Sequence, residues 1–227
     1  MPAEGARIGR VGPQGSLGRG QVAGLVLAAG AGRRYGMPKA LVPYEENLLV
    51  ERAYRLVASV CDPVLVVLGA AAEEVMSRAD LGNATVLLNP DWDTGLGSSL
   101  RTGLAAVSAQ CGGLPANHQS GGLPANHQVG GDAGQVDAVL VHLVDLPGMT
   151  VAALHRMARY ASADVLAVAT YDGVRGHPVL LGRGHWAGVA DSATGDQGAR
   201  AYLAAHEVTE IECADVADPA DLDYPPT

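Results

Sequence analysis

The chain has 227 residues, of which 48% are hydrophobic and 17% charged, and it carries a formal charge of −9. A chain of this length can bury a substantial core within one domain. The acidic balance argues against a protein that binds duplex nucleic acid through a basic face. Small anionic ligands are not excluded, because a few local arginines can outweigh the global charge.

The first 21 residues are rich in glycine and arginine and lack the apolar core of a signal peptide. We therefore expect a disordered leader at 1–21 and a folded domain at 22–227. The three cysteines are far apart and form no CxxC pair, so reduced thiols are expected rather than disulfides or structural zinc. No apolar stretch reaches membrane-spanning length. These features predict a cytoplasmic protein with no membrane partner.

Strand and helix patterns alternate through the rest of the chain. In order, we expect strand 22–28, helix 47–60, strand 63–69, helix 71–79, strand 84–89, helix 98–109, strand 136–144, helix 150–161, strands 164–171 and 177–181, helix 197–206 and strand 207–213. Ser98 is expected to cap its helix. This alternation predicts a single-domain, Rossmann-like α/β fold with an open, mainly parallel sheet flanked by helices. Ligands bind such sheets beyond the carboxyl ends of the strands.

An internal repeat interrupts the pattern, since GGLPANHQ occurs at 112–119 and again at 121–128. Two polar units are too few to build a solenoid core. We expect a surface-loop insertion at 111–135 produced by tandem duplication. The alternative, a metal site formed by His118 and His127, has no carboxylate or thiolate to complete it.

The stretch LAAGAGRRYGMPKA (27–40) follows the first expected strand and has the character of a phosphate-binding loop. A dinucleotide fingerprint would need a third glycine where Tyr35 stands and an acidic residue after the second strand, and both are missing. An NAD-type oxidoreductase is therefore disfavoured. A P-loop would need Ser or Thr after the lysine, but Lys39 precedes Ala40. What remains is a backbone cradle for a nucleoside triphosphate, in which Gly30 and Gly32 allow close approach.

Two basic side chains of this loop supply charge for that cradle. Arg34 can form a forked contact with phosphate, and Lys39 can act as a point charge. Farther along, Asp145 ends an apolar strand and is followed by Leu-Pro, which exposes its carboxylate at the ligand edge. Magnesium is held by one or two carboxylates together with phosphate oxygens, so Asp145 is the expected metal ligand. Capping of the helix at Thr150 is the alternative role for this carboxylate.

Four stretches resemble nucleotidyltransferases of the molybdenum cofactor type, and their order matches. They are LAAGAGRRYGMPKAL (27–41), NPDWDTGLGSSLRTGL (89–104), VHLVDLPGMT (141–150), and YDGVRGHPVLLGRGHW (171–186) with GDQGAR (195–200). The resemblance runs from about Val22 to Leu222. LAAG, RGHP and GDQGAR are similar to the molybdenum cofactor cytidylyltransferase branch. A nucleotide-diphospho-sugar transferase-like fold is the expectation that follows.

The resemblance also implies roles for residues. Arg34, Lys39 and Asp145 are expected to be catalytic. The expected nucleotide-binding residues are Leu27, Ala28, Ala29, Gly30, Gly32, Arg34, Lys39, Asn89, Gly95, Ser98, Ser99, Arg101 and Asp145. The expected acceptor-binding residues are Arg175, Gly176, His177, Pro178 and Asp196. The expected metal ligands are Asp145, Asp196 and Asp215, which would bind Mg²⁺ or, in its place, Mn²⁺.

The second metal ligand is the point at which the chain departs from its relatives. They often end with Asp-Thr-Pro-Glu-Asp-Leu, whose first Asp can hold metal, whereas Ala217 occupies that place here. Asp196 and Asp215 are the substitutes, although each can also serve as a helix cap or a surface charge.

The sequence thus predicts transfer of a nucleoside monophosphate, CMP from CTP, to molybdopterin-bound molybdenum cofactor, with release of pyrophosphate. The expected partners are the triphosphate, the molybdopterin-type acceptor and, transiently, proteins that mature molybdoenzymes. Nucleic acid is not among them. A guanylyltransferase or a sugar-phosphate nucleotidyltransferase is the nearest alternative. A non-catalytic protein that binds nucleotide or cofactor is the alternative of another class.

Overall fold

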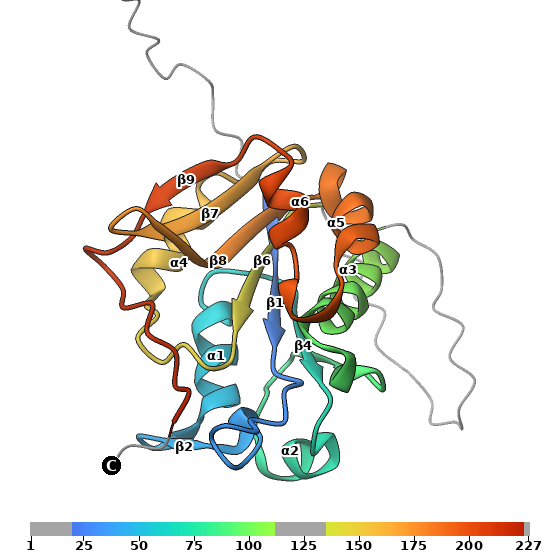
Figure 1. Ribbon diagram of the computed structural model, residues 1–227, viewed down its shortest axis with the longest axis vertical. Coiled ribbons are helices and arrows are strands. Elements are labelled where there is room, and N and C mark those ends of the chain that lie inside the picture. The colour runs from blue at the N-terminus through green and yellow to red at the C-terminus, as the bar shows by residue number, and fades with distance from the viewer. Residues whose placement is uncertain (1–19, 112–134, 225–227) are drawn as a thin grey trace, which may run out of the picture.

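The computed structural model describes residues 20–111 and 135–224 (Figure 1). The expected leader up to residue 19 and most of the expected insertion, including His118 and His127, lie outside the described residues, whereas Gln21, expected in the leader, begins the first strand. Within those ranges the chain forms one α/β domain around a central sheet. None of the helices in the described part of the chain is long and apolar enough to cross a membrane.

A seven-stranded sheet forms the middle of the domain, with the strand order β5-β4-β1-β6-β8-β7-β9. Its strands are β1 (Gln21–Leu27), β4 (Val64–Leu68), β5 (Thr85–Leu88), β6 (Val136–Leu143), β7 (Leu166–Tyr171), β8 (Val174–Gly182) and β9 (Thr209–Glu212). Strand β8 pairs antiparallel with both of its neighbours, β6 and β7, whereas the other pairings are parallel. The carboxyl ends of six strands therefore meet at one edge, which confirms the expected mainly parallel sheet.

Helices cover both faces of this sheet (Figure 1). They are α1 (Leu49–Ala58), α2 (Ala72–Arg78), α3 (Leu96–Cys111), α4 (Val151–Ala158), α5 (Trp186–Ser192) and α6 (Arg200–Ala204). Alternate strand residues point to opposite faces, so β1 buries Val22 and Val26 on one side and Leu25 and Leu27 on the other. One apolar layer packs against α1 and α4, and the second packs against α3, α5 and α6.

Some local expectations were wrong, each for a physical reason. Helix α3 begins at Leu96, so Ser98 lies in its first turn instead of capping it, and its hydroxyl donates to the carbonyls of Asp91 and Gly95. The strand expected at 177–181 extends over all of β8 because it forms a hairpin with β7.

Helix α5 was not expected, because Gly188 interrupts its helical pattern. A Cβ on Gly188 would lie 2.5 Å from the ring of Tyr202, so packing against α6 requires glycine there.

Short elements complete the ligand edge. The loop after β1 contains the 3-10 turn η1 (Lys39–Leu41) and leads to the hairpin of β2 (Pro43–Tyr44) and β3 (Asn47–Leu48). The turn η2 (Trp92–Thr94) precedes α3 and η4 (Gly195–Gln197) precedes α6. The turn η3 (Arg183–His185) follows the antiparallel β8, so it lies at the opposite edge, where it precedes α5. The last described segment returns to this edge, where the Leu222 amide donates to the Asp145 carbonyl at 2.9 Å.

Candidate active site

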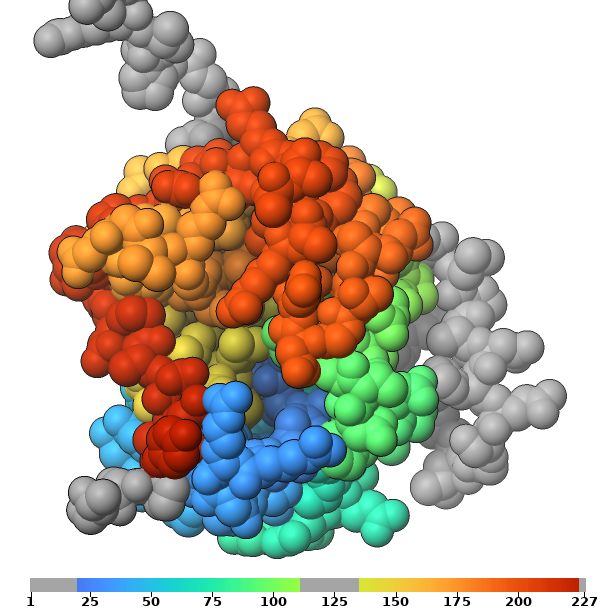
Figure 2. Space-filling view, in the orientation of Figure 1, coloured from blue at the N-terminus to red at the C-terminus, as the bar shows by residue number. Residues whose placement is uncertain are grey.

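A cleft of about 470 Å³ lies at the carboxyl edge of the sheet, between the loops that follow β1 and β6 and the start of α3. Figure 2 shows the surface hollowed between these blue, yellow and green segments, with the orange segment that contains η4 above them. Ten of the predicted site residues line it: Leu27, Ala29, Gly30, Gly32, Arg34, Lys39, Gly95, Ser99, Asp145 and Asp196. The structure thus brings together residues from four separate stretches of sequence.

The glycine-rich loop owes its shape to Gly32. This residue has a φ of +59°, and a Cβ on it would lie 1.9 Å from the Met37 carbonyl oxygen. The Gly36 amide donates to the Gly32 carbonyl at 2.8 Å and closes the turn. Tyr35 and Met37 pack against the core beneath the loop. Position 32 therefore tolerates only glycine. With glycine there, the loop can fold back and present its backbone to the cleft.

Lys39 occupies the centre of the charged end of the cleft. Its ammonium donates to Asp145 at 2.7 Å and to Asp223 at 2.8 Å, and Arg34 donates to the other oxygen of Asp223 at 2.9 Å. The two carboxylates are neighbours because they share one nitrogen. Lys39 and Asp145 are mostly shielded from solvent, with side chains 14% and 21% exposed, whereas Arg34 is 71% exposed.

The pKa values of this cluster follow from its contacts. Burial by itself would lower the pKa of Lys39, but hydrogen bonds and charge attraction from Asp145 and Asp223 outweigh it and raise the pKa. Hydrogen bonding to Lys39 lowers the pKa of Asp223, and Arg34 adds to this shift. Lys39 and Asp223 are therefore both charged at neutral pH.

Asp223 lines the cleft and was not predicted from the sequence. It lies 184 positions after Lys39 in the chain and belongs to no recognised motif. The backbone contact between Leu222 and Asp145 brings it to the cleft. The signal in the sequence was weak. Asp223 is one of several aspartates at the carboxyl end, and it directly follows Leu222, where the resemblance to the family ends.

A buried polar network supports the start of α3. The side-chain amide of Asn89 donates to Ser98 at 2.8 Å and to Ser99 at 3.0 Å, and its oxygen accepts from the Asp91 amide. All three predicted residues are at most 4% exposed, and only Ser99 lines the cleft. Asn89 and Ser98 thus hold the loop in place from below, while Ser99 faces the ligand space.

Two other predicted nucleotide-binding residues point away from the cleft lining. Ala28 is buried in the core on the α1 side of the sheet. The guanidinium of Arg101 donates to the backbone carbonyl of Ala193. Arg101 therefore ties α3 to the segment before η4, and its contact with a ligand stays a prediction.

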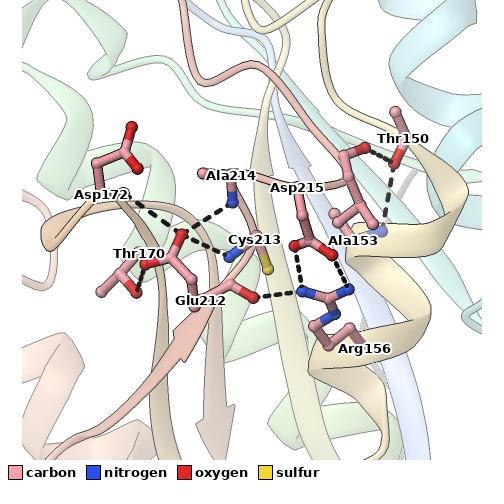
Figure 3. A network of polar contacts seen from close by, with 10 residues as sticks. Thr150, Ala153, Arg156, Thr170, Asp172, Glu212, Cys213, Ala214 and Asp215 are labelled. Atoms are coloured by element: carbon pink, nitrogen blue, oxygen red, sulfur yellow. Dashed lines mark hydrogen bonds and ion pairs between the residues drawn. The ribbon is translucent and has the colours of Figure 1, made fainter.

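The structure does not assemble the three carboxylates expected to hold metal. Asp145 and Asp196 line the cleft, but Asp215 forms a bidentate ion pair with Arg156 of α4 and points toward it in Figure 3. This pairing lowers the pKa of Asp215. No group of three or more His, Cys, Asp and Glu side chains suited to a metal occurs in 20–111 and 135–224. Asp223 takes the position beside Asp145 that was expected for Asp215.

The predicted acceptor residues divide among three places. Asp196 lines the cleft, while Arg175 and Gly176 line a separate hollow of about 660 Å³, where Arg175 pairs with Glu210 at 2.8 Å. His177 lines a third, smaller pocket and Pro178 is buried on β8. The structure therefore does not gather these five residues into one site.

Comparison with known proteins identifies the family. The sequence model of the MobA-like NTP transferase domain matches residues 24–210. The chain is 36% identical over 216 residues to nicotine blue oxidoreductase of Paenarthrobacter nicotinovorans, covering 89% of this chain and 92% of that one. It is 28% identical over 87 residues to molybdenum cofactor cytidylyltransferase of Escherichia coli strain K12, covering 38% of this chain and 45% of that one.

A solved structure shares the fold. The Rv0371c protein of Mycobacterium tuberculosis H37Rv, in complex with manganese, is 25% identical, with a TM-score of 0.63 and coverage of 85% of this chain and 88% of that chain. The family match spans most of the chain and includes the glycine loop, Asp145 and the start of α3. The chain belongs to the MobA-like NTP transferase family and has the α/β fold of nucleotidyltransferases.

Proposed function

We propose that this chain transfers CMP from CTP to a phosphorylated acceptor of the molybdopterin type and releases pyrophosphate. The observation that carries the proposal is the shared ion pair, in which Lys39 lies between Asp145 and Asp223 beside the glycine-rich loop. The cationic side chains and backbone amides of the glycine-rich loop would bind the triphosphate. The two carboxylates would bind the divalent cation that accompanies it.

The cluster fits a divalent cation. Two carboxylates converge on one cationic nitrogen, and oxygen donors of this kind are the ligands that Mg²⁺ prefers. Asp145 and Asp223 would hold Mg²⁺ or Mn²⁺, and Asp196 lies in the same cleft. When bound, the cation neutralises charge on the departing pyrophosphate. The manganese complex of Rv0371c supports divalent metal use in a relative.

The chain's own residues orient the reactants. The backbone of the loop at Gly30 and Gly32 binds the phosphates, and Lys39 and Arg34 add positive charge next to them. Ser99 contacts the nucleotide at the start of α3, which Asn89 holds in place. A terminal phosphate oxygen of the acceptor attacks the α-phosphorus, and the bond to pyrophosphate breaks. Positioning and charge stabilisation suffice for this displacement, so no covalent enzyme intermediate is required.

The finer assignment rests on similarity. The cytidylyltransferase of Escherichia coli supports CTP and a molybdopterin-type acceptor, although the match covers 38% of this chain. Proteins that mature molybdoenzymes are the proposed transient partners. The proposed compartment is the cytoplasm, where thiols such as the buried Cys61 and Cys213 stay reduced.

Pyrophosphate release tests the proposal. The protein is incubated with CTP, GTP, ATP or UTP, Mg²⁺ or Mn²⁺, and a molybdopterin acceptor. We expect release with CTP, whereas release with GTP alone would indicate the guanylyltransferase alternative. Asp145→Asn should reduce turnover by at least about 100-fold because a metal ligand is lost, and the exposed Asp191→Asn is the matched control. Triphosphate binding without turnover on any acceptor, sugar phosphates included, would support the non-catalytic alternative.

A second candidate function is oxidoreductase activity. It is favoured by the 36% identity with nicotine blue oxidoreductase over 216 residues. The missing dinucleotide fingerprint in the glycine loop opposes it. Mixing the protein with nicotine blue and NADH or NADPH, and following the dinucleotide absorbance, separates the two. Oxidation of the dinucleotide that depends on the dye, without pyrophosphate release from any triphosphate, selects the oxidoreductase.

A further inference from the structure

A small apolar pocket opens beside the cleft, between the sheet and α6. Its volume is about 100 Å³, and it shares Leu27, Leu96 and Leu143 with the cleft. The rest of its apolar wall comes from α3, β6, β8 and α6: Leu100, Val141, Val179, Leu181 and Leu203. We call this space the ring pocket. The three shared residues place the ring pocket directly beside the cleft.

The lining of the ring pocket is mainly apolar. Its polar lining residues are His177, Gln197 and Arg200, and Arg200 is exposed to solvent at the start of α6. Burial lowers the pKa of His177, so its imidazole is neutral at physiological pH. Its Nδ1 faces the Val141 carbonyl oxygen at 3.4 Å, which assigns the ring proton to Nδ1. Nε2 remains an acceptor with no protein partner among the described residues.

Size and polarity restrict the occupant. An apolar cavity of roughly 150 Å³ binds benzene. The ring pocket is smaller, at about 100 Å³, so it holds at most one six-membered ring, with one edge of the ring left toward the cleft. A charged group would lose its hydration against leucine and valine side chains, and the one cation in the lining, Arg200, is exposed to solvent and offers a screened partner only. A flat, uncharged ring loses little hydration and gains apolar contact. A ring that carries an N–H or O–H on its edge can also donate to His177.

We propose that the ring pocket binds one uncharged, flat ring of the acceptor, with a hydrogen-bond donor on its edge directed at His177. The acceptor's phosphate then lies in the cleft near Lys39. The inference rests on the proposed transfer reaction, because it assigns the acceptor end of the same site. The ring pocket would hold the ring of the acceptor, and the cleft would hold the rest of that molecule.

Binding of a minimal probe tests the ring pocket directly. Phenol is an uncharged ring with one donor, and benzoate is a charged ring of similar size. Ligand-observed NMR with saturating CTP and Mg²⁺ measures both. We expect phenol to bind the wild-type protein with a millimolar Kd and benzoate to bind at least tenfold more weakly.

A matched pair of variants on α6 locates the binding. Leu203 is 7% exposed and lines the pocket, whereas the neighbouring Ala204 is exposed. Leu203→Trp fills the pocket and should weaken phenol binding at least tenfold, while Ala204→Trp should leave it unchanged. If Leu203→Trp does not fold, Leu203→Ala replaces it. That enlarged pocket should bind 2-naphthol at least threefold more tightly than wild type does.

Each outcome decides the inference. Equal binding of phenol and benzoate, or phenol binding that neither Leu203 variant changes, overturns it. Displacement of phenol by pterin supports the inference and identifies the ring as that of a pterin. Failure of pterin to compete overturns the assignment of this pocket to a molybdopterin-type acceptor. Pyrophosphate release is scored separately. Release with no phenol binding rejects the ring pocket alone. Phenol binding without release from any triphosphate leaves a ring-binding pocket, but it rejects the proposed function and, with it, the assignment of the ring to an acceptor.

Discussion

The ammonium of Lys39 keeps two carboxylates close together that would otherwise repel each other. Asp145 comes from the end of β6, and Asp223 comes from the last described segment, so one side chain joins parts of the chain that are far apart in sequence. At the scale of single residues, this ion pair is the main electrostatic feature of the cleft. Asp223 deserves the same experimental test as the residues found from motifs.

We expect Asp223→Asn to reduce nucleotidyl transfer about 10–100-fold at a fixed Mg²⁺ concentration and to raise the metal concentration needed for half-maximal rate. The physical reason is the loss of one of two adjacent carboxylates at the proposed cation site. Asp221→Asn, an exposed change in the same segment, is the control. Titration of Mg²⁺ against the initial rate measures both variants. Identical titration curves for the wild type and Asp223→Asn would contradict the assignment.

His142 makes stability depend on pH. It lies within β6, is 1% exposed, and has an Nδ1 with no partner in the described part of the chain. Burial lowers its pKa from 6.5 to about 3. Between these values the unfolded state binds a proton that the folded state does not. The free energy of unfolding therefore falls as pH falls below 6.5, by up to about 1.4 kcal/mol for each pH unit.

His142→Leu should reduce the loss of stability between pH 7 and pH 5 because the variant has no group at this position to protonate. The exposed His155→Leu should leave that loss nearly unchanged. Urea unfolding of both variants at the two pH values measures the difference. Equal slopes for the two variants would falsify the role assigned to His142.

At the scale of elements, the cleft depends on two loops that approach each other closely. Gly95, just before α3, has a φ of +110°, and a Cβ on it would lie 2.4 Å from the backbone of Gly195 in η4. Arg101 of α3 adds a hydrogen bond to Ala193 on the same side. The position of Asp196 in the cleft is therefore set by α3 as much as by its own turn.

Gly95→Ala should lower the free energy of unfolding more than Gly173→Ala does. Both glycines have positive φ, so alanine introduces backbone strain of roughly 1–3 kcal/mol at either site. The space around Gly173 is open, whereas Gly95 adds a collision that costs about 1–3 kcal/mol more. Chemical unfolding of the two variants measures the difference. Equal destabilisation would show that the two loops separate freely.

Sequence patterns predicted the repeating elements well but not their long-range pairings. The apolar runs identified β1, β4 and β6 because these strands are buried on both faces. No local pattern could show that β8 lies between β6 and β7, since strand order is set by contacts between distant segments. The same limit explains Asp215 and Asp223. Both are exposed or half-buried aspartates in one acidic segment, and only the folded chain shows that Arg156 takes one and Lys39 the other.

At the scale of the whole molecule, an acidic protein brings three cationic side chains to one edge of the sheet. The formal charge is −9, and Arg33, Arg34 and Lys39 line the cleft together with Asp93, Asp145, Asp196 and Asp223. Local cations of this kind can attract an anionic ligand despite the overall charge. Binding there should stabilise the entire domain, because the cleft joins β1, β6 and α3.

CTP with Mg²⁺ should raise the Tm of the whole protein by roughly 5–10 °C at a concentration of 100 times Kd. Binding to the folded state alone contributes about 2.7 kcal/mol under that condition, and each kcal/mol shifts Tm by roughly 2–4 °C in a domain of this size. Differential scanning fluorimetry with and without EDTA measures the shift. No change in Tm with any triphosphate, with metal present, would argue against the nucleotide site.

The position of Lys39 between Asp145 and Asp223 has a thermodynamic consequence. Any cation that replaces the ammonium between these carboxylates frees Lys39 to bind an anion, so the two ligands help each other. Linkage requires this help to be reciprocal: the factor by which metal tightens triphosphate binding equals the factor by which triphosphate tightens metal binding. The affinity for metal, measured with and without triphosphate, and the affinity for triphosphate, measured with and without metal, must therefore give the same coupling free energy.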